Sequence, residues 1–192
     1  MKSYAYECAE CGAEATLDDE GAISRTCTHS GSVFANMEAT VTLATAGQQL
    51  IATKMFEQGV AFIEAYALLA KDPRGEPREY VALHLLCQGT ELVLKALLLF
   101  ADYDKYKPTL KNLRHYLRKA LASVKQCYPL DEWDVVAVAE FDALSELYEK
   151  HWLRYANEYQ VFIPPSAIVV ENFMRELAKL MELGFKRKSD EQ

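Results

Sequence analysis

The sequence is poor in residues that interrupt or cross-link a fold. Its 192 residues include only 8 Gly and 6 Pro, and 51% are hydrophobic, which excludes a collagenous, low-complexity or disordered chain. Three of the five cysteines fall within the first 27 residues, so they are too few and too unevenly placed for a disulfide scaffold. The length allows one domain, or a small module followed by a compact domain of about 140–150 residues.

The sequence also lacks an export signal, a membrane span and a positive net charge. Glu7 and Cys8 stand where a secretory signal needs an apolar run. The most apolar stretch, residues 83–101, contains a histidine, a glutamine, a glutamate and a lysine, which is typical of a buried helix rather than a membrane span. The net charge of −7 provides no overall attraction to nucleic acid or anionic lipid. We therefore expect a cytoplasmic protein that does not contact membranes.

The charges are distributed unevenly along the chain. Residues 1–47 carry two basic residues against seven acids, whereas residues 102–127 carry seven basic residues against two acids, with three tyrosines between them. Basic residues interleaved with aromatic rings are typical of a surface that contacts a polyanion. The predicted nucleic-acid contacts are Lys111, Arg114 and Arg118; a solvated helix face is the alternative interpretation.

The pattern of apolar residues changes near Ala46 and Gly47. Before this point they alternate with polar residues, which predicts short strands around residues 4–8, 15–17, 23, 33 and 41–43. After it they recur at helical spacing. We therefore predict two domains, a small β module over residues 1–46 and a helical domain over residues 47–192.

The second part predicts five helices. They cover about residues 48–71, 78–101, a stretch from Thr109, 131–155 and 166–184, with Asp131 as an N-cap and Gly184 just beyond the last helix. The second helix is apolar on almost every side and belongs at the centre of a bundle. The predicted fold class is mainly α, a five-helix bundle preceded by a small N-terminal β zinc-ribbon module.

The zinc prediction rests on four residues of the first part. Cys8 and Cys11 form a CxxC knuckle followed by a glycine, and Cys27 and His29 follow at the distance of a hairpin. Two intervening residues let both thiolates reach one ion, and four such ligands suit tetrahedral Zn²⁺ in a closed, structural site. The alternative, a redox CxxC pair, needs a βαβ context that this segment lacks. If His29 is not a ligand, a water, a carboxylate or a partner must complete the site.

The second helix carries a strip of polar residues, His84, Gln88, Glu91 and Lys95, at positions that share one face. Glu91 and Lys95 are spaced for an i, i+4 ion pair. We interpret this strip as the solvent-facing edge of a central helix rather than as the lining of a cleft. His151, among leucines of the fourth helix, is predicted to be a core histidine.

Three segments together resemble a known superfamily. Residues 84–98 read HLLCQGTELVLKALL, residues 113–117 read LRHYL, and Arg154 and Tyr155 follow later. Over about residues 50–184 the chain resembles the all-α HEPN superfamily (higher eukaryote and prokaryote nucleotide-binding domain). The resemblance implies a helical bundle that often dimerises and, in many members, a metal-independent ribonuclease of toxin and antiviral defence systems. Their active site pairs an Arg that holds the scissile phosphate with a His, with four to six residues between the two.

This sequence departs from that pattern. Tyr159, Gln160 and Val161 stand where the His should follow Arg154. Arg78 and His84 have the permitted spacing, but six helical steps place them about 120° apart around the axis. The candidate catalytic residues are therefore Arg78, His84 and Arg154, with no complete pair among them. Arg154 is either an anion-binding residue or a partner of Glu158 one turn later.

We expect a zinc-containing interaction or regulatory protein with a non-catalytic, HEPN-like dimerising bundle, as part of a bacterial or phage defence system. The expected partners are another protein and a second copy of this chain. The alternatives are a HEPN-type metal-independent ribonuclease, and a binder of nucleic acid or nucleotides that does not cleave them.

Overall fold

The chain divides into two units, residues 1–48 and 49–192. The computed structural model describes residues 4–8, 11, 13–17, 23–25, 27–28, 33–35, 37–71, 76–155 and 167–189. The division lies two residues beyond the boundary expected at residue 46. Helix α1 (Met37–Leu69) begins in the first unit and continues into the second, so residues 44–47 are helical.

The first unit contains a four-stranded antiparallel sheet. Its strands are β1 (Tyr4–Cys8), β2 (Glu14–Leu17), β3 (Ile23–Arg25) and β4 (Val33–Ala35), in the order β3-β2-β1-β4. The strand expected around residues 41–43 is wrong, because both positions lie in α1. Alanine, glutamate, glutamine and leucine surround them, and these helix-forming residues outweigh four β-branched ones, Thr40, Val41, Thr42 and Thr45.

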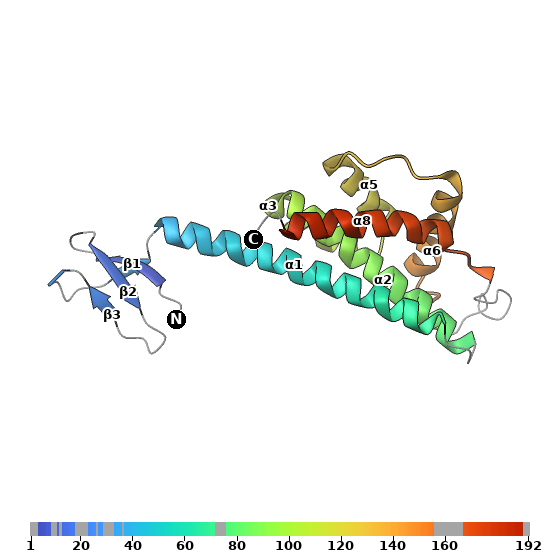
Figure 1. The fold of residues 1–192 in the computed structure, drawn as a ribbon, viewed down its shortest axis with the longest axis horizontal. Coiled ribbons are helices and arrows are strands. Elements are labelled where there is room, and N and C mark those ends of the chain that lie inside the picture. The colour runs from blue at the N-terminus through green and yellow to red at the C-terminus, as the bar shows by residue number, and fades with distance from the viewer. Residues whose placement is uncertain are drawn as a thin grey trace. The chain divides into compact units, whose positions relative to one another are not determined.

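The second unit is helical, and the mainly helical fold class is confirmed. Its other long helices are α2 (Glu76–Ala101), α5 (Leu117–Cys127), α6 (Val135–Glu149) and α8 (Glu171–Ser189). Three short elements join α2 to α5: α3 (Tyr103–Tyr106), a 3-10 turn (Lys107–Thr109) and α4 (Leu110–Leu113). Figure 1 shows α2 running alongside α1 in this unit.

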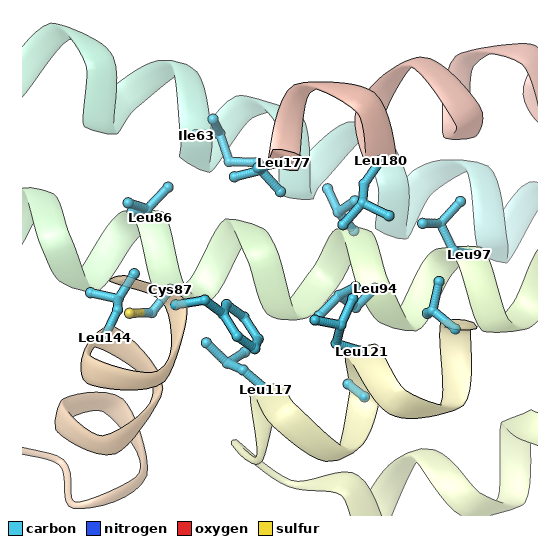
Figure 2. Packing of buried hydrophobic residues seen from close by; sticks show 14 of the residues in the cluster. Ile63, Leu86, Cys87, Leu94, Leu97, Leu117, Leu121, Leu144, Leu177 and Leu180 are labelled. Atoms are coloured by element: carbon cyan, nitrogen blue, oxygen red, sulfur yellow. The ribbon is translucent and has the colours of Figure 1, made fainter. Parts of the chain in front are cut away.

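Helix α2 is the centre of the core, as its apolar sequence predicts. Leu86, Leu94 and Leu97 are each 0% exposed. Figure 2 shows α2 leucines between side chains of α1 and α8 on one side and of α5 and α6 on the other. Cys87 is likewise fully buried, as expected of a small apolar residue. Residues 78–101 are long and apolar enough to cross a membrane, but core helices have the same composition and most of this stretch is buried.

Two helix boundaries differ from the prediction for a local reason. The expected third helix is broken at Arg114, whose φ of 41° and ψ of −127° end α4 and separate it from α5. The fourth helix begins at Val135 rather than near Asp131, because the carboxylate of Asp134 caps it by accepting a hydrogen bond from the Val136 amide at 2.8 Å. It ends at Glu149, six residues before the expected end at residue 155.

Gly184 was expected to end the last helix, but it does not. It lies inside α8, where a Cβ atom would stand 2.1 Å from Cε2 of Phe56 in α1. The glycine therefore serves the close approach of α8 to the Phe56 ring. Gly59 and Gly89 play the same part between α1 and α2, since a Cβ on Gly89 would lie 2.7 Å from the carbonyl oxygen of Gly59.

Candidate functional site

The candidate site is centred on Tyr148 of α6. Its hydroxyl lies 2.7 Å from Oε2 of Glu91 and 2.8 Å from Oε1 of Gln88, both on α2. Glu91 is only 5% exposed. The polar strip of α2 therefore faces other helices, and the interpretation as a solvent-facing edge is wrong. The segment between α4 and α5 and the end of α6 cover this strip and turn it into a buried polar network.

Glu91 is the anion of this network. Oε1 accepts a hydrogen bond from Lys95 at 2.5 Å, which confirms the predicted i, i+4 pair, and Oε2 lies 2.9 Å from Nδ1 of His115. Burial opposes the charge on Glu91, but hydrogen bonds from Lys95, His115 and Tyr148 outweigh it and hold the pKa below its usual value. The carboxylate is thus ionised at neutral pH. Because an ionised carboxylate only accepts, Nδ1 of His115 carries the proton that joins them.

Three of the four histidines in the chain lie close together here, His84 and His115 beside the Tyr148 ring and His151 beside His115. The ring centroids of His84 and His115 lie 5.6 and 5.3 Å from that of Tyr148, and His151 lies 5.5 Å from His115. The guanidinium carbon of Arg154 stands 5.9 Å from the same Tyr148 centroid. We call these five residues the Tyr148 site. Imidazoles and a guanidinium in one place supply proton transfer and anion binding.

His84 is held in its neutral form. Burial lowers the pKa of this imidazole first, and the positive charge of Arg154 lowers it further. Its Nδ1 atom is buried and has no hydrogen-bond partner among the described residues. In the neutral form one ring nitrogen of an imidazole carries no proton and can accept one.

The backbone of the site is strained at two points. Among the described residues other than glycine, Arg114 (φ 41°) and His151 (φ 59°) have positive φ angles. Such angles are uncommon for residues with a Cβ atom and gather where the surrounding structure enforces a functional geometry. Here one precedes His115 and is held by the hydrogen bond from Lys95 to the Arg114 carbonyl at 3.0 Å. The other orients His151 itself.

Two of the three candidate catalytic residues come together. His84 and Arg154, 70 positions apart, share the Tyr148 site. Arg78 belongs to α2, which begins at Glu76, so its side chain leaves the axis about 120° from that of His84 and the site is built without it. His151 was expected in the core, but α6 ends before it and the residue is exposed. Residues 159–161 lie outside the described part of the chain.

The predicted nucleic-acid contacts border this site. Lys111, Arg114 and Arg118 are all exposed, on the segment that carries His115 into the Tyr148 site. Arg118 is partly neutralised by Asp142, whose Oδ1 lies 3.4 Å from its Nε atom. His115 and Tyr148 were missed as site residues, because the only signal was the presence of His115 within a basic segment.

Of the predicted zinc ligands, Cys8, Cys11 and Cys27 lie at one end of the sheet. The loop from β1 to β2 begins at Cys8 and contains Cys11. The segment carrying Cys27 leaves β3 at Arg25, beside Ala15, and enters β4 at Val33, which pairs with Cys8. Among the described residues no group of three metal-ligating side chains is found, and His29 lies outside them. The pairing of the strands therefore brings Cys8 and Cys11 to the same end of the sheet as the segment that carries Cys27.

Comparison with protein-family models, with curated proteins and with solved structures finds no match. Function must therefore be argued from the chemistry of the site itself.

Proposed function

We propose that the helical unit binds a phosphodiester at the Tyr148 site and cleaves RNA without a metal ion, as the ribonucleases of the HEPN superfamily do. The observation that supports it is the meeting of Arg154, His84 and His115 around one tyrosine ring. The non-catalytic interpretation rested on the closed zinc site, on the acidic residues 1–47 and on the missing Arg–His pair. The tertiary structure supplies imidazoles from α2, from the residues before α5 and from the turn after α6 instead.

The proposed reaction uses the 2′-hydroxyl of the RNA as nucleophile. The 2′-oxygen forms a bond to the adjacent phosphorus as the bond from phosphorus to the 5′-oxygen breaks. His84, kept neutral by burial and by Arg154, takes the 2′-hydroxyl proton. The imidazole of His115 or of His151 donates a proton to the leaving 5′-oxygen. Arg154 stabilises the negative charge that develops on the phosphoryl oxygens.

Glu91 acts through His115 rather than on the substrate. Its hydrogen bond to Nδ1 leaves Nε2 as the ring nitrogen available for proton transfer, in the way a buried carboxylate orients a catalytic histidine. Lys95 and Tyr148 hold the carboxylate in place. Glu91 is therefore a positioning residue of the proposed enzyme.

The test is cleavage of single-stranded RNA by the full chain in buffer without added Mg²⁺. We expect His84→Gln and Arg154→Ala each to reduce the rate by about 10²-fold or more, the scale of a lost general base. Lys150→Ala, an exposed residue near the same end of α6, is the matched control and should retain the wild-type rate. Wild-type activity no greater than that of a His84→Gln/Arg154→Ala double variant contradicts the proposal and returns the chain to the class of non-catalytic interaction modules.

We also propose that the first unit binds one structural Zn²⁺ through Cys8, Cys11, Cys27 and His29. The support is the register of the sheet, which brings the two ligand-bearing loops to one edge. A unit of 48 residues buries too little apolar surface to be stable by itself, and metal binding is the usual remedy. Dimerisation, a protein partner, a role in defence and a cytoplasmic location remain predictions.

A further inference from the structure

A hollow lies away from the Tyr148 ring, between α5, α6 and the segment that leads into α6. It has a volume of about 240 Å³. Leu121, Trp133 and Phe141 line it and are 7, 8 and 3% exposed. Trp133 and Phe141 meet edge to face, with their centroids 5.3 Å apart. The floor of the hollow is thus apolar. The volume of the hollow is below the roughly 300 Å³ of the smallest pockets for drug-sized ligands.

The rim of the hollow is cationic. Arg118 and Lys125 are exposed and stand seven residues apart on α5, which places them on one face two turns apart. The ammonium of Lys125 lies 5.3 Å from the centroid of the Trp133 indole. Asp142 is the one acid among the lining residues, and it pairs with Arg118. Lys125 therefore leaves a net positive charge above an aromatic floor.

The apolar surface continues from the hollow along α6. Val138 lines the hollow and is 38% exposed, and Val135, one turn earlier on the same face, is 82% exposed. Two exposed valines beside an aromatic hollow form a larger apolar surface than one small ligand needs. An aromatic anchor in a pocket, surrounded by flatter apolar contacts and a charged rim, is the usual arrangement of a protein–protein contact.

We propose that this hollow receives an aromatic side chain of a partner polypeptide that carries acidic residues on both sides of it. The ring enters above Leu121 and Phe141, the chain follows Val138 and Val135, and the acids face Lys125 and Arg118. This inference does not depend on the proposed ribonuclease activity, because none of its residues belongs to the Tyr148 site.

The test uses a model peptide, acetyl-Glu-Glu-Phe-Glu-Glu-amide, and its Phe-to-Ala counterpart. Binding is followed through the fluorescence of Trp133 in the full chain with Trp152→Phe. We expect saturable binding of the phenylalanine peptide in the millimolar to micromolar range, and at least tenfold weaker binding of the alanine peptide. Lys125→Glu should weaken binding of the phenylalanine peptide at least tenfold. Val138→Asp, on the other side of the hollow, should weaken this binding to the same extent.

Lys119→Glu is the matched control, since Lys119 is an exposed lysine of the same helix that packs on Tyr116 instead, 4.2 Å from its ring centroid. Equal effects of Lys119→Glu and Lys125→Glu, or equal binding of the two peptides, overturn the proposal. Binding of 2-naphthoate as tight as that of the peptide indicates a small-molecule site and also overturns the proposal. Displacement of the peptide by single-stranded RNA, with Lys125→Glu weakening both, assigns the rim to nucleic acid and also overturns it.

Discussion

Nδ1 of His115 donates a hydrogen bond to Oε2 of Glu91 across 2.9 Å, although 24 residues separate the two. The contact closes the loop between α2 and α5 over the polar strip of α2. It also sets the tautomer of His115, because a carboxylate can only accept. The buried network around Glu91 thus links the stability of the helical unit to the geometry of the Tyr148 site.

Glu91→Gln should destabilise the helical unit by about 3 kcal/mol, because it leaves the ammonium of Lys95 buried without its counter-charge. Urea denaturation at pH 7 measures the change. Adding Lys95→Met should recover part of the loss. Glu146→Gln removes the exposed partner of Lys150 and should leave the midpoint nearly unchanged; equal shifts for Glu91→Gln and Glu146→Gln argue against a buried network.

The stability of the helical unit should fall as the pH drops below about 6.5, the ordinary pKa of histidine. Burial and Arg154 lower the pKa of His84 in the folded state, so the unfolded chain binds more protons just below that pH and is favoured there. Denaturation midpoints between pH 8 and 5 measure the slope. His84→Gln should reduce it, and identical slopes for the wild type and this variant exclude His84 as its source.

Gly184→Ala should cost about 1–3 kcal/mol, even though alanine favours helices, because its Cβ would collide with the Phe56 ring. A double variant with Phe56→Leu should lose less than the two single changes added together. Gly47→Ala is the matched control, since no atom lies within 4 Å of a Cβ at that helical position. Thermal denaturation that ranks the two alanine variants equally contradicts the close packing of α8 on α1.

The purified chain should contain one equivalent of zinc by elemental analysis. Cys11→Ser and Cys27→Ser should each release it, and His29→Gln tests the fourth ligand. Cys127→Ser should retain the metal, because Cys127 belongs to the helical unit and contacts the Tyr106 hydroxyl at 3.0 Å. Zinc that survives the loss of both Cys11 and Cys27 rules out the proposed site.

RNA binding by the His84→Gln variant should weaken as the salt concentration rises. Adding Lys111→Ala should reduce the steepness of log K against the logarithm of salt concentration by about 1. Lys111 is exposed, so its charge is available to a phosphate. Arg118→Ala should have a smaller effect, because Asp142 already neutralises part of its charge. Lys71→Ala, an exposed lysine beyond the end of α1, should leave the slope unaltered.

Local patterns in the sequence were sufficient for some features. The all-round apolar character of residues 83–101 predicts a central helix, and α2 is the core of the unit. The i, i+4 spacing predicts the pair of Glu91 and Lys95, which is present. Both predictions depend on residues within one helix, where backbone geometry relates sequence distance directly to spatial distance.

Other predictions failed where the answer depended on a distant neighbour. A glycine near the end of an apolar period is typical of a helix terminus, but at position 184 it is required by a phenylalanine 128 residues earlier. His151 was assigned to the core because leucines precede it. The helix instead ends at Glu149, and the turn that follows exposes the imidazole.

The helical class, the central position of α2 and the uneven placement of the chain's cysteines follow from the amino-acid sequence. Each depends on composition or on a period within one element. The meeting of His84, His115 and Arg154 around Tyr148, with His151 beside His115, depends instead on tertiary packing. These residues come from three separate segments, and no spacing along the chain encodes the packing that joins them. The buried carboxylate of Glu91 on α2 binds both His115 and Tyr148, and it therefore joins all three segments.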